Sequence, residues 1–362
     1  MSEFMKIGDI CDILNGYAFK SSKYVADGIR VIRITNVQKG FVEDTNPQYY
    51  PVSEQREIEK YMLCEGDLLM SLTGNVGRVG LLSAEMLPAA LNQRVACIRI
   101  RNPAVIYKPF LFHLLNSDYF ENKCIFASQG VAQKNMSTEW LKEYRIPSFS
   151  MDKQMEIASI FDKIDDLIAS RKEQVQNLDQ LVKSRFIELF GDPVINPKGF
   201  PCYTVGEVID FQGGSQPDKK FFEYEASPDN IRLIQIRDYK SDKYITYIPK
   251  TMAKRFCTAD DIMIGRYGPP IFQILKGIEG SFNVALMKAT PKMGNREFIR
   301  QFLKQDCLLE YLEGLSKRTA GQDGIQMDKL KAYPFPYPPM EMQEQFAAFV
   351  EQTDKSKYYS VA

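Results

Sequence analysis

The chain has 362 residues, with 46 basic and 46 acidic side chains, one histidine and 44% hydrophobic residues. This length and apolar content predict a globular protein of two or more domains. No apolar run approaches the roughly 18 residues of a membrane span, and the first residues do not form a signal sequence, so we expect a cytoplasmic protein. One histidine and seven widely spaced cysteines argue against a His-based triad, a zinc site and a disulfide scaffold.

In chain order, short alternating or apolar runs punctuated by Gly, Asn and Pro predict strands, and two amphipathic stretches predict short helices. The predicted strands cover residues 30–37, 67–72, 94–100, 232–237 and 261–264. The predicted short helices cover residues 109–117 and 297–304. This mixture predicts an α+β fold.

The predicted elements belong to an internal repeat. Residues 7–10 recur as 205–208, and residues 29–34 recur as 231–236. The longest match pairs residues 147–165 with 336–354 at a constant offset of 189 residues. Several matches in the same order, with slowly drifting offsets, indicate a duplicated unit rather than shared strand propensity.

A long helix follows the first copy. Ser150 is a suitable N-cap, and Gly191 before Asp192 and Pro193 predicts the end of the helix. Its apolar residues fall mostly three, four or seven positions apart, which indicates packing against a partner helix. We expect this packing to involve Ile157, Phe161, Ile164, Ile168, Val175, Leu178, Val182 and Leu189.

The second copy begins the same helix after Pro338 and Pro339, and we expect the two helices to pack antiparallel. Past Asp165 the first helix continues for 25 residues, whereas 8 residues follow the equivalent Asp354. We therefore expect the second helix to be truncated, and the distal half of the central helix to be covered by a second copy of the chain or by a partner subunit.

These observations predict four segments: a first recognition domain (1–150), a central spacer helix (151–191), a second recognition domain (192–338) and a truncated C-terminal spacer helix (339–362). The arrangement is pseudo-twofold, with two similar domains joined by long coiled-coil-forming helices. A long helical spacer between two similar heads is typical of a two-headed binding protein.

No catalytic motif stands out along the chain. Residues 74–80 are rich in glycine but lack both the dinucleotide and the P-loop pattern, so a tight turn followed by a strand is expected. Residues 267–271 partly match a methyltransferase motif, but Gly268 replaces the residue that would accept the amine proton. We expect no metal site and no cofactor site in this chain.

The zero net charge conceals local excesses of basic residues. Residues 71–110 carry five basic side chains and one acidic side chain, and residues 288–304 carry the same ratio. Two polar loops, 130–137 and 317–326, occupy matching places in the two copies and are rich in amide and cationic groups that can contact bases and phosphates. Similar loops with different residues favour two DNA-recognition heads of different specificity.

We select DNA-contact candidates from these segments. In the first copy they are Arg78, Gln93, Arg94, Gln129, Gln133, Lys134 and Asn135. In the second copy they are Arg237, Arg266, Lys317, Arg318, Gln322 and Gln326.

The whole chain resembles the specificity (S) subunits of type I restriction-modification systems. The resemblance rests on the order and duplication of several short segments and on the helix that follows the first copy. These segments are residues 7–10, 66–71, 90–95, 133–137, 146–147, 154, 190–193, 324–328 and 336–343.

This resemblance implies that each copy is a target recognition domain for one half of a bipartite, asymmetric site in double-stranded DNA. It implies that the helices set the spacer length and bind two methyltransferase subunits, and that restriction subunits join them. It also implies that the chain has no activity of its own. S-adenosylmethionine, ATP and Mg²⁺ would then be bound by the partner subunits.

Two other functions remain open at the level of sequence. The chain could be the recognition portion of a fused methyltransferase-nuclease, which methylation by the purified chain would reveal. It could instead be a two-headed protein-binding scaffold. Salt-sensitive binding to duplex DNA would distinguish the DNA-binding functions from that scaffold.

Overall fold

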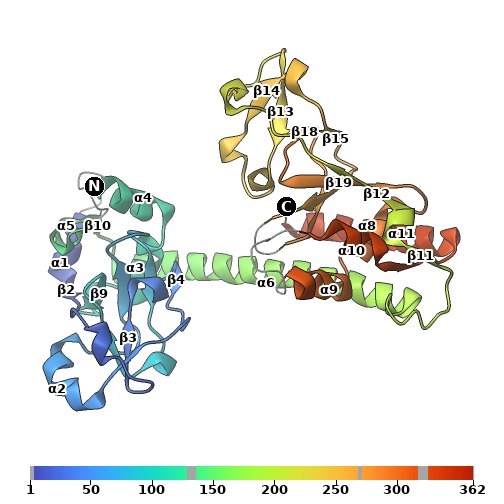
Figure 1. The fold of residues 1–362 in the computed structure, drawn as a ribbon. Helices are drawn as coiled ribbons and strands as arrows, with labels where there is room; N and C mark the ends of the chain where they lie inside the picture. The colour runs from blue at the N-terminus through green and yellow to red at the C-terminus, as the bar shows by residue number, and fades with distance from the viewer. Residues whose placement is uncertain (1–3, 129–135, 268–270, 317–324, 362) are drawn as a thin grey trace. The chain divides into compact units, whose positions relative to one another are not determined.

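The computed structural model describes residues 4–128, 136–267, 271–316 and 325–361. The chain forms two compact units, Met1–Ile168 and Ala169–Ala362, and the long helix α6 (Met151–Phe190) runs through the division between them. Figure 1 shows α6 as one continuous helix. Each unit has its own hydrophobic core, so each is described separately.

The first unit contains two main sheets. The larger sheet has the order β2-β9-β6-β7-β4, the smaller has the order β5-β3-β8, and β1 pairs with β10. The strands are β1 (Phe4–Lys6), β2 (Cys11–Asn15), β3 (Ile29–Ile32), β4 (Gly40–Phe41), β5 (Tyr49–Tyr50), β6 (Leu68–Ser71), β7 (Val79–Leu81), β8 (Ala89–Leu91), β9 (Val95–Ile100) and β10 (Arg145–Pro147). The helices are α1 (Ile7–Ile10), α2 (Gln55–Ile58), α3 (Lys108–Leu115), α4 (Asp118–Ala127), α5 (Thr138–Glu143) and the beginning of α6.

The second unit repeats this arrangement. Its sheets have the orders β12-β19-β16-β17 and β14-β13-β18-β15, and β11 pairs with β20. The strands are β11 (Cys202–Thr204), β12 (Ile209–Gly213), β13 (Asn230–Ile234), β14 (Tyr247–Pro249), β15 (Phe256–Cys257), β16 (Ile262–Gly265), β17 (Gln273–Lys276), β18 (Gly280–Phe282), β19 (Leu286–Pro291) and β20 (Pro334–Pro336). The helices are α7 (Val205–Val208), α8 (Arg296–Leu303), α9 (Asp306–Ser316), α10 (Met327–Ala332) and α11 (Met340–Val361).

The structure confirms the duplicated α+β fold. The order β2-β9-β6-β7 in the first unit matches β12-β19-β16-β17 in the second, strand for strand and in chain order. The parallel pair β3–β8 likewise matches β13–β18. The two short predicted helices are observed as α3 and α8, each shifted by one or two residues from its predicted ends.

Two predicted strands end earlier than expected. The 30–37 strand is β3 only as far as Ile32, after which residues 34–36 form a 3₁₀ turn, and the 232–237 strand turns in the same way at residues 236–239. In both cases a side chain three residues on, Asn36 or Asp238, accepts a hydrogen bond from the backbone N–H that precedes the turn. These local side-chain bonds compete with the sheet ladder and therefore end the strand.

Helix α6 begins and ends where the sequence predicts. The Ser150 hydroxyl accepts a hydrogen bond from the Lys153 N–H at 3.4 Å, as an N-cap does. At the other end, Gly191 has a φ of +77°, a left-handed conformation that glycine adopts without strain, and its N–H donates to the Ile187 carbonyl.

Helix α11 packs antiparallel to the distal part of α6 within the second unit. Near the start of α11, the Phe346 ring lies 5.6 and 5.4 Å from the rings of Phe186 and Phe190. Near its end, the Lys357 ammonium lies 2.6 Å from the Asp179 carboxylate. The two helices therefore run in opposite directions along their contact.

The cover of the distal half of α6 differs from the expectation. Val182 is buried in the core of the second unit, and Leu189 packs against the same core. Val175 and Leu178 are partly buried. This chain itself covers these positions, because α8 and α11 supply the apolar side chains that meet them. The exposed apolar positions lie instead in the proximal half, at Phe161, Ile164 and Ile168.

Candidate nucleic-acid interface

The residues proposed for DNA contact fall into two groups. Six lie in the described parts of the chain: Arg78, Gln93, Arg94, Arg237, Arg266 and Gln326. Seven lie outside the described residues: Gln129, Gln133, Lys134, Asn135, Lys317, Arg318 and Gln322. Only the first group can be placed on the fold.

In the first unit, several loops meet at the ends of the strands of both sheets. The Asn92 N–H donates to the Ile32 carbonyl at 3.2 Å, the Leu72 N–H donates to the Arg94 carbonyl at 3.0 Å, and the Tyr17 N–H donates to the Leu91 carbonyl at 2.8 Å. These bonds join the loops 16–19, 33–36, 72–78 and 92–94, which we call the first edge. Gln93 and Arg94 both lie there with exposed side chains.

In the second unit, the equivalent loops meet through three equivalent bonds. The Asn283 N–H donates to the Ile234 carbonyl at 3.0 Å, the Arg266 N–H donates to the Ala285 carbonyl at 2.9 Å, and the Ser215 N–H donates to the Phe282 carbonyl at 3.1 Å. We call the loops 214–217, 235–239, 266–267 and 283–285 the second edge. The candidate residues Arg237 and Arg266 both belong to it.

The two edges share a backbone frame but carry different side chains. Where the first edge has Arg94, the second has Ala285, and where the first has Leu72, the second has Arg266. The position of Thr35 is taken by Arg237. The same loops therefore present cationic groups at different points, an arrangement suited to distinguishing different ligand surfaces.

Hydrogen bonds and ring contacts orient several of these side chains. The Arg78 guanidinium donates to the Gln38 side-chain oxygen at 2.8 Å, and the Arg237 guanidinium donates to the Thr246 hydroxyl at 2.9 Å. The Arg266 guanidinium carbon lies 5.3 Å from the centre of the half-exposed Tyr267 ring, within the range of a cation–π interaction. These contacts position the side chains and leave further N–H groups of each guanidinium for a ligand.

Gln326 serves at least in part as a structural residue. It precedes α10, its carbonyl accepts from the Leu330 N–H at 3.0 Å, and its side chain is partly buried. The first described residue after the 129–135 segment, Met136, donates its N–H to the Leu72 carbonyl at 2.8 Å. The described end of that polar segment therefore reaches the first edge.

Part of the basic excess in residues 71–110 supports the fold. Arg99 makes two bonds to the buried Asp67 carboxylate, with its Nε at 2.9 Å and its Nη2 at 2.5 Å. This contact and burial act in opposite directions on the pKa of Arg99, and the hydrogen bond from Asp67 prevails, raising it. Arg101 pairs with Asp12 at 3.0 Å. Both arginines brace the sheet, so neither is a free cation for phosphate binding.

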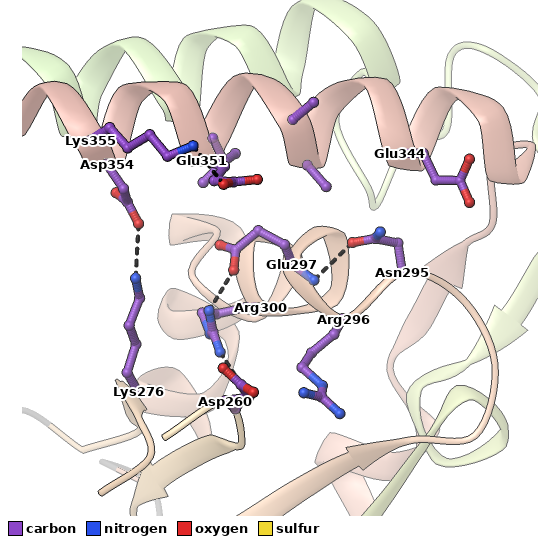
Figure 2. Close-up of a pocket in the computed structure, with 13 residues that line it drawn as sticks. Asp260, Lys276, Asn295, Arg296, Glu297, Arg300, Glu344, Glu351, Asp354 and Lys355 are labelled. Atoms are coloured by element: carbon purple, nitrogen blue, oxygen red, sulfur yellow. Dashed lines mark hydrogen bonds and ion pairs between the residues drawn. The ribbon is translucent and has the colours of Figure 1, made fainter. Parts of the chain in front are cut away.

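A cavity of about 680 Å³ lies beside α8 and α11 in the second unit (Figure 2). Its charged groups pair with one another: Lys276 with Asp354 at 3.0 Å, Arg300 with Glu297, and Lys355 with Glu351. Because basic and acidic groups alternate and neutralise one another, the cavity lacks the excess of one charge that an anionic ligand requires. Its pairs instead hold α11 against α8 and the sheet.

Two glutamines of the repeat are structural residues whose role sequence reasoning missed. Gln154 is buried, its side-chain oxygen accepts from the Tyr107 N–H at 2.8 Å, and its amide donates to the carbonyls of Val105 and Phe149. Gln343, at the equivalent position, accepts from the Asn295 N–H at 2.8 Å and donates to the Pro338 carbonyl at 2.8 Å. The matched glutamines in the repeat were the available signal, since each joins the start of a long helix to the loop before α3 or α8.

Among the described residues, no group of three or more His, Cys, Asp or Glu side chains is arranged to hold a metal ion. Burial raises the pKa of the Cys11 and Cys124 thiols to about 12, so both remain protonated near neutral pH. No described helix combines the length and apolar character needed to cross a membrane.

The chain matches the family model of the type I restriction modification DNA specificity domain twice, over residues 1–180 and 197–358. It is 24% identical over 385 aligned positions to a putative type I restriction enzyme specificity subunit, MjaX, from Methanocaldococcus jannaschii, covering 97% of this chain and 86% of that protein. It is 32% identical over 171 residues to the EcoAI specificity subunit of Escherichia coli, covering 46% of this chain and 28% of that protein.

A third relative, the MjaVIII specificity subunit of M. jannaschii, is 27% identical over 185 residues, and the match spans 43% of its length. Among solved structures, the chain is similar to an S subunit from M. genitalium, with a TM-score of 0.51, 14% identity, and coverage of 99% of this chain and 90% of that one. A structure described as showing complex assembly and conformational transition of the type I R-M system matches with a TM-score of 0.53 and 17% identity, covering 99% of this chain and 91% of that one.

These two structures support the fold, and the family model, which covers most of the chain in two copies, supports the role. The chain belongs to the type I restriction modification DNA specificity family, whose role is the recognition of DNA sequence.

Proposed function

We propose that this chain recognises a bipartite, asymmetric DNA site, with the first edge contacting one half-site and the second edge the other. The observation that carries this proposal is the set of three equivalent backbone bonds that hold the two edges in the same frame while their side chains differ. Identical frames allow the same mode of docking, and different side chains give each half-site its own sequence.

The exposed groups on the edges are suited to base recognition. An arginine can donate two hydrogen bonds to guanine, and a glutamine can pair with adenine in the major groove. Gln93 and Arg94 supply such groups on the first edge, and Arg237 and Arg266 supply them on the second. Each good bidentate contact contributes about 1–3 kcal/mol of discrimination against the wrong base.

The charge balance supports a role that depends on partners. The chain has no net charge, and Arg99 and Arg101 are engaged in ion pairs within the fold. Because nonspecific DNA affinity comes mainly from phosphate contacts, this chain alone is expected to bind DNA weakly. We propose that two methyltransferase subunits complete the contact with the duplex and that restriction subunits join them.

In this proposal the chain is a non-catalytic subunit. S-adenosylmethionine would be bound by the methyltransferase subunits, and ATP with Mg²⁺ by the restriction subunits. Methylation of DNA by the purified chain with S-adenosylmethionine alone would contradict this assignment.

The direct test is to sequence the methylated bases of a host that expresses the complete system. We expect one methylated motif made of two unequal half-sites separated by an unspecified spacer of constant length. A single continuous motif, or a palindromic motif, would contradict recognition by two heads of different specificity.

A further inference from the structure

The proximal part of α6 carries an apolar face that is exposed in the first unit, whereas the equivalent face of α11 is buried in the second. Offsetting the repeat by 189 residues pairs Ile157 with Phe346, Phe161 with Val350, and Ile164 with Thr353. Phe161 and Ile164 are 47% and 44% exposed, whereas Val350 and Thr353 are 1% and 5% exposed. We call the residues Ile157, Ile160, Phe161, Ile164 and Ile168 the open face of α6.

The second unit shows what covers the equivalent face. Phe346 contacts the rings of Phe186 and Phe190, which lie one turn apart on the distal part of α6. The same two rings also pack against Phe298 of α8, at centroid distances of 5.6 and 4.9 Å. An antiparallel helix with two aromatic side chains one turn apart therefore closes the core between α8 and α11.

The first unit contains space beside its open face. A cavity of about 490 Å³ is lined by Ile157 and Phe161 of α6 together with Phe110, Phe112 and Leu114 of α3. Phe110 is equivalent to Phe298, and Ile157 to Phe346, the two residues that hold the aromatic pair in the second unit. The cavity therefore adjoins the positions at which the second unit receives Phe186 and Phe190.

From this comparison we propose that the open face of α6 is a docking site for an amphipathic helix of another polypeptide. That helix would run antiparallel to α6 and place two aromatic side chains, one turn apart, against Phe110 and Ile157. A second copy of this chain does not fit this description, because its own aromatic pair is buried in the core of its second unit. This inference does not depend on which DNA sequence the two edges recognise.

The opposing charges near the face add a constraint on the partner. His113 of α3 lies 2.6 Å from the Asp162 carboxylate, and its other ring nitrogen lies 3.7 Å from Asp165. The His113 ring also stacks on Phe161 at 5.4 Å. Because Asp162 and Asp165 remain more than half exposed, a partner helix with a basic residue on its flank would gain a favourable contact.

The probe for this site is a fluorescent synthetic peptide with the sequence of residues 176–191, which includes Phe186 and Phe190. Fluorescence anisotropy with the full chain is expected to show saturable binding with one peptide per chain. Replacing both peptide phenylalanines by alanine is expected to weaken binding by at least about tenfold, because buried aromatic anchors dominate such interfaces.

Variants of the chain locate the binding. The double change Phe161→Asp and Ile164→Asp is expected to weaken peptide binding by at least about tenfold, because it places charges on the apolar face. The matched control is Leu181→Asp, which alters an exposed apolar residue of the same helix outside the open face and is expected to leave binding unchanged. Circular dichroism of each variant verifies that the fold is retained.

Three results would overturn the proposal. The wild-type chain could fail to bind the peptide, or binding could be equally strong in the double variant. Light scattering could also show a dimer that the double variant converts to a monomer, which would assign the open face to a second copy instead of a different polypeptide.

Discussion

The two long helices begin in the same way but differ in what surrounds them. Gln154 and Gln343 fix the start of α6 and α11 through equivalent bonds to the preceding loops. One turn later the two helices diverge, since the apolar face of α11 packs on α6 and the same face of α6 is open. The difference shows that a helix partner, not the local sequence, decides whether a repeated position belongs to a core.

The largest expected effect is at the first position of this face. Phe346→Ala should destabilise the second unit by about 3–5 kcal/mol, because it removes a fully buried ring from a cluster of aromatic side chains. The equivalent change Ile157→Ala should cost only about 1 kcal/mol, because that side chain is partly exposed and its loss leaves a smaller cavity.

Hydrogen exchange measured by mass spectrometry checks this pair of variants, because it reports each unit separately where a single unfolding curve would not. Phe346→Ala should accelerate exchange in α8 and α11, while the first unit stays protected. Equal losses of protection for the two variants would mean that the faces do not differ in burial.

Sequence reasoning predicted the fold better than the site. The matching offsets identified the duplication, and Ser150 and Gly191 marked the ends of α6, because capping chemistry is local. The 3₁₀ turns after β3 and β13 were missed, since Asn36 and Asp238 act only once the strand has brought their backbone partners close. The burial of Val182 and the exposure of Phe161 could not be predicted, because helical periodicity does not specify which neighbour covers each turn.

The edges show the same limit for the candidate site. Residue type and a basic local composition identified Arg94 and Arg266, but nothing in the sequence indicated that Arg99 pairs with the buried Asp67. Several loops far apart in the sequence form each edge, and the strand pairing that joins them is nonlocal. The polar residues of the 129–135 and 317–324 segments remain predictions.

The glutamine brackets should behave alike in the two units. Gln154→Leu should cost the first unit about 2–3 kcal/mol, because it leaves the Tyr107 N–H and the Val105 and Phe149 carbonyls without their buried partner. Gln343→Leu should cost the second unit a similar amount. Exposed Gln176→Leu is the control, and thermal unfolding of all three measures the effect. A wild-type melting profile for Gln154→Leu would contradict a structural role.

A smaller effect is expected from acid, and only in the second unit. Burial raises the pKa of Asp354, but hydrogen bonds from Lys357 and Lys276 outweigh burial and hold this pKa below its ordinary value. The pairs therefore stabilise α11 fully above the pKa of an unfolded aspartate, about 3.9, and this stabilisation is lost as the pH falls through the lower, folded value.

Asp354→Asn should remove about 1 kcal/mol of stability at pH 7, because the carboxylate is partly exposed, and should flatten the acid dependence between about pH 5 and pH 3. Urea unfolding across this pH range, followed by a probe in α11, measures both quantities. If the variant keeps the acid dependence of the wild type, another carboxylate is responsible.

The central claim is that each edge recognises its own half-site, and methylome sequencing of hosts carrying Arg94→Ala or Arg266→Ala in the complete system tests it most directly. The account predicts that Arg94→Ala relaxes sequence preference within one half-site and Arg266→Ala within the other, with the spacer unchanged, while the exposed control Arg171→Ala leaves the motif intact. Relaxation of the same half-site by both variants, or an unchanged motif in both, would contradict it.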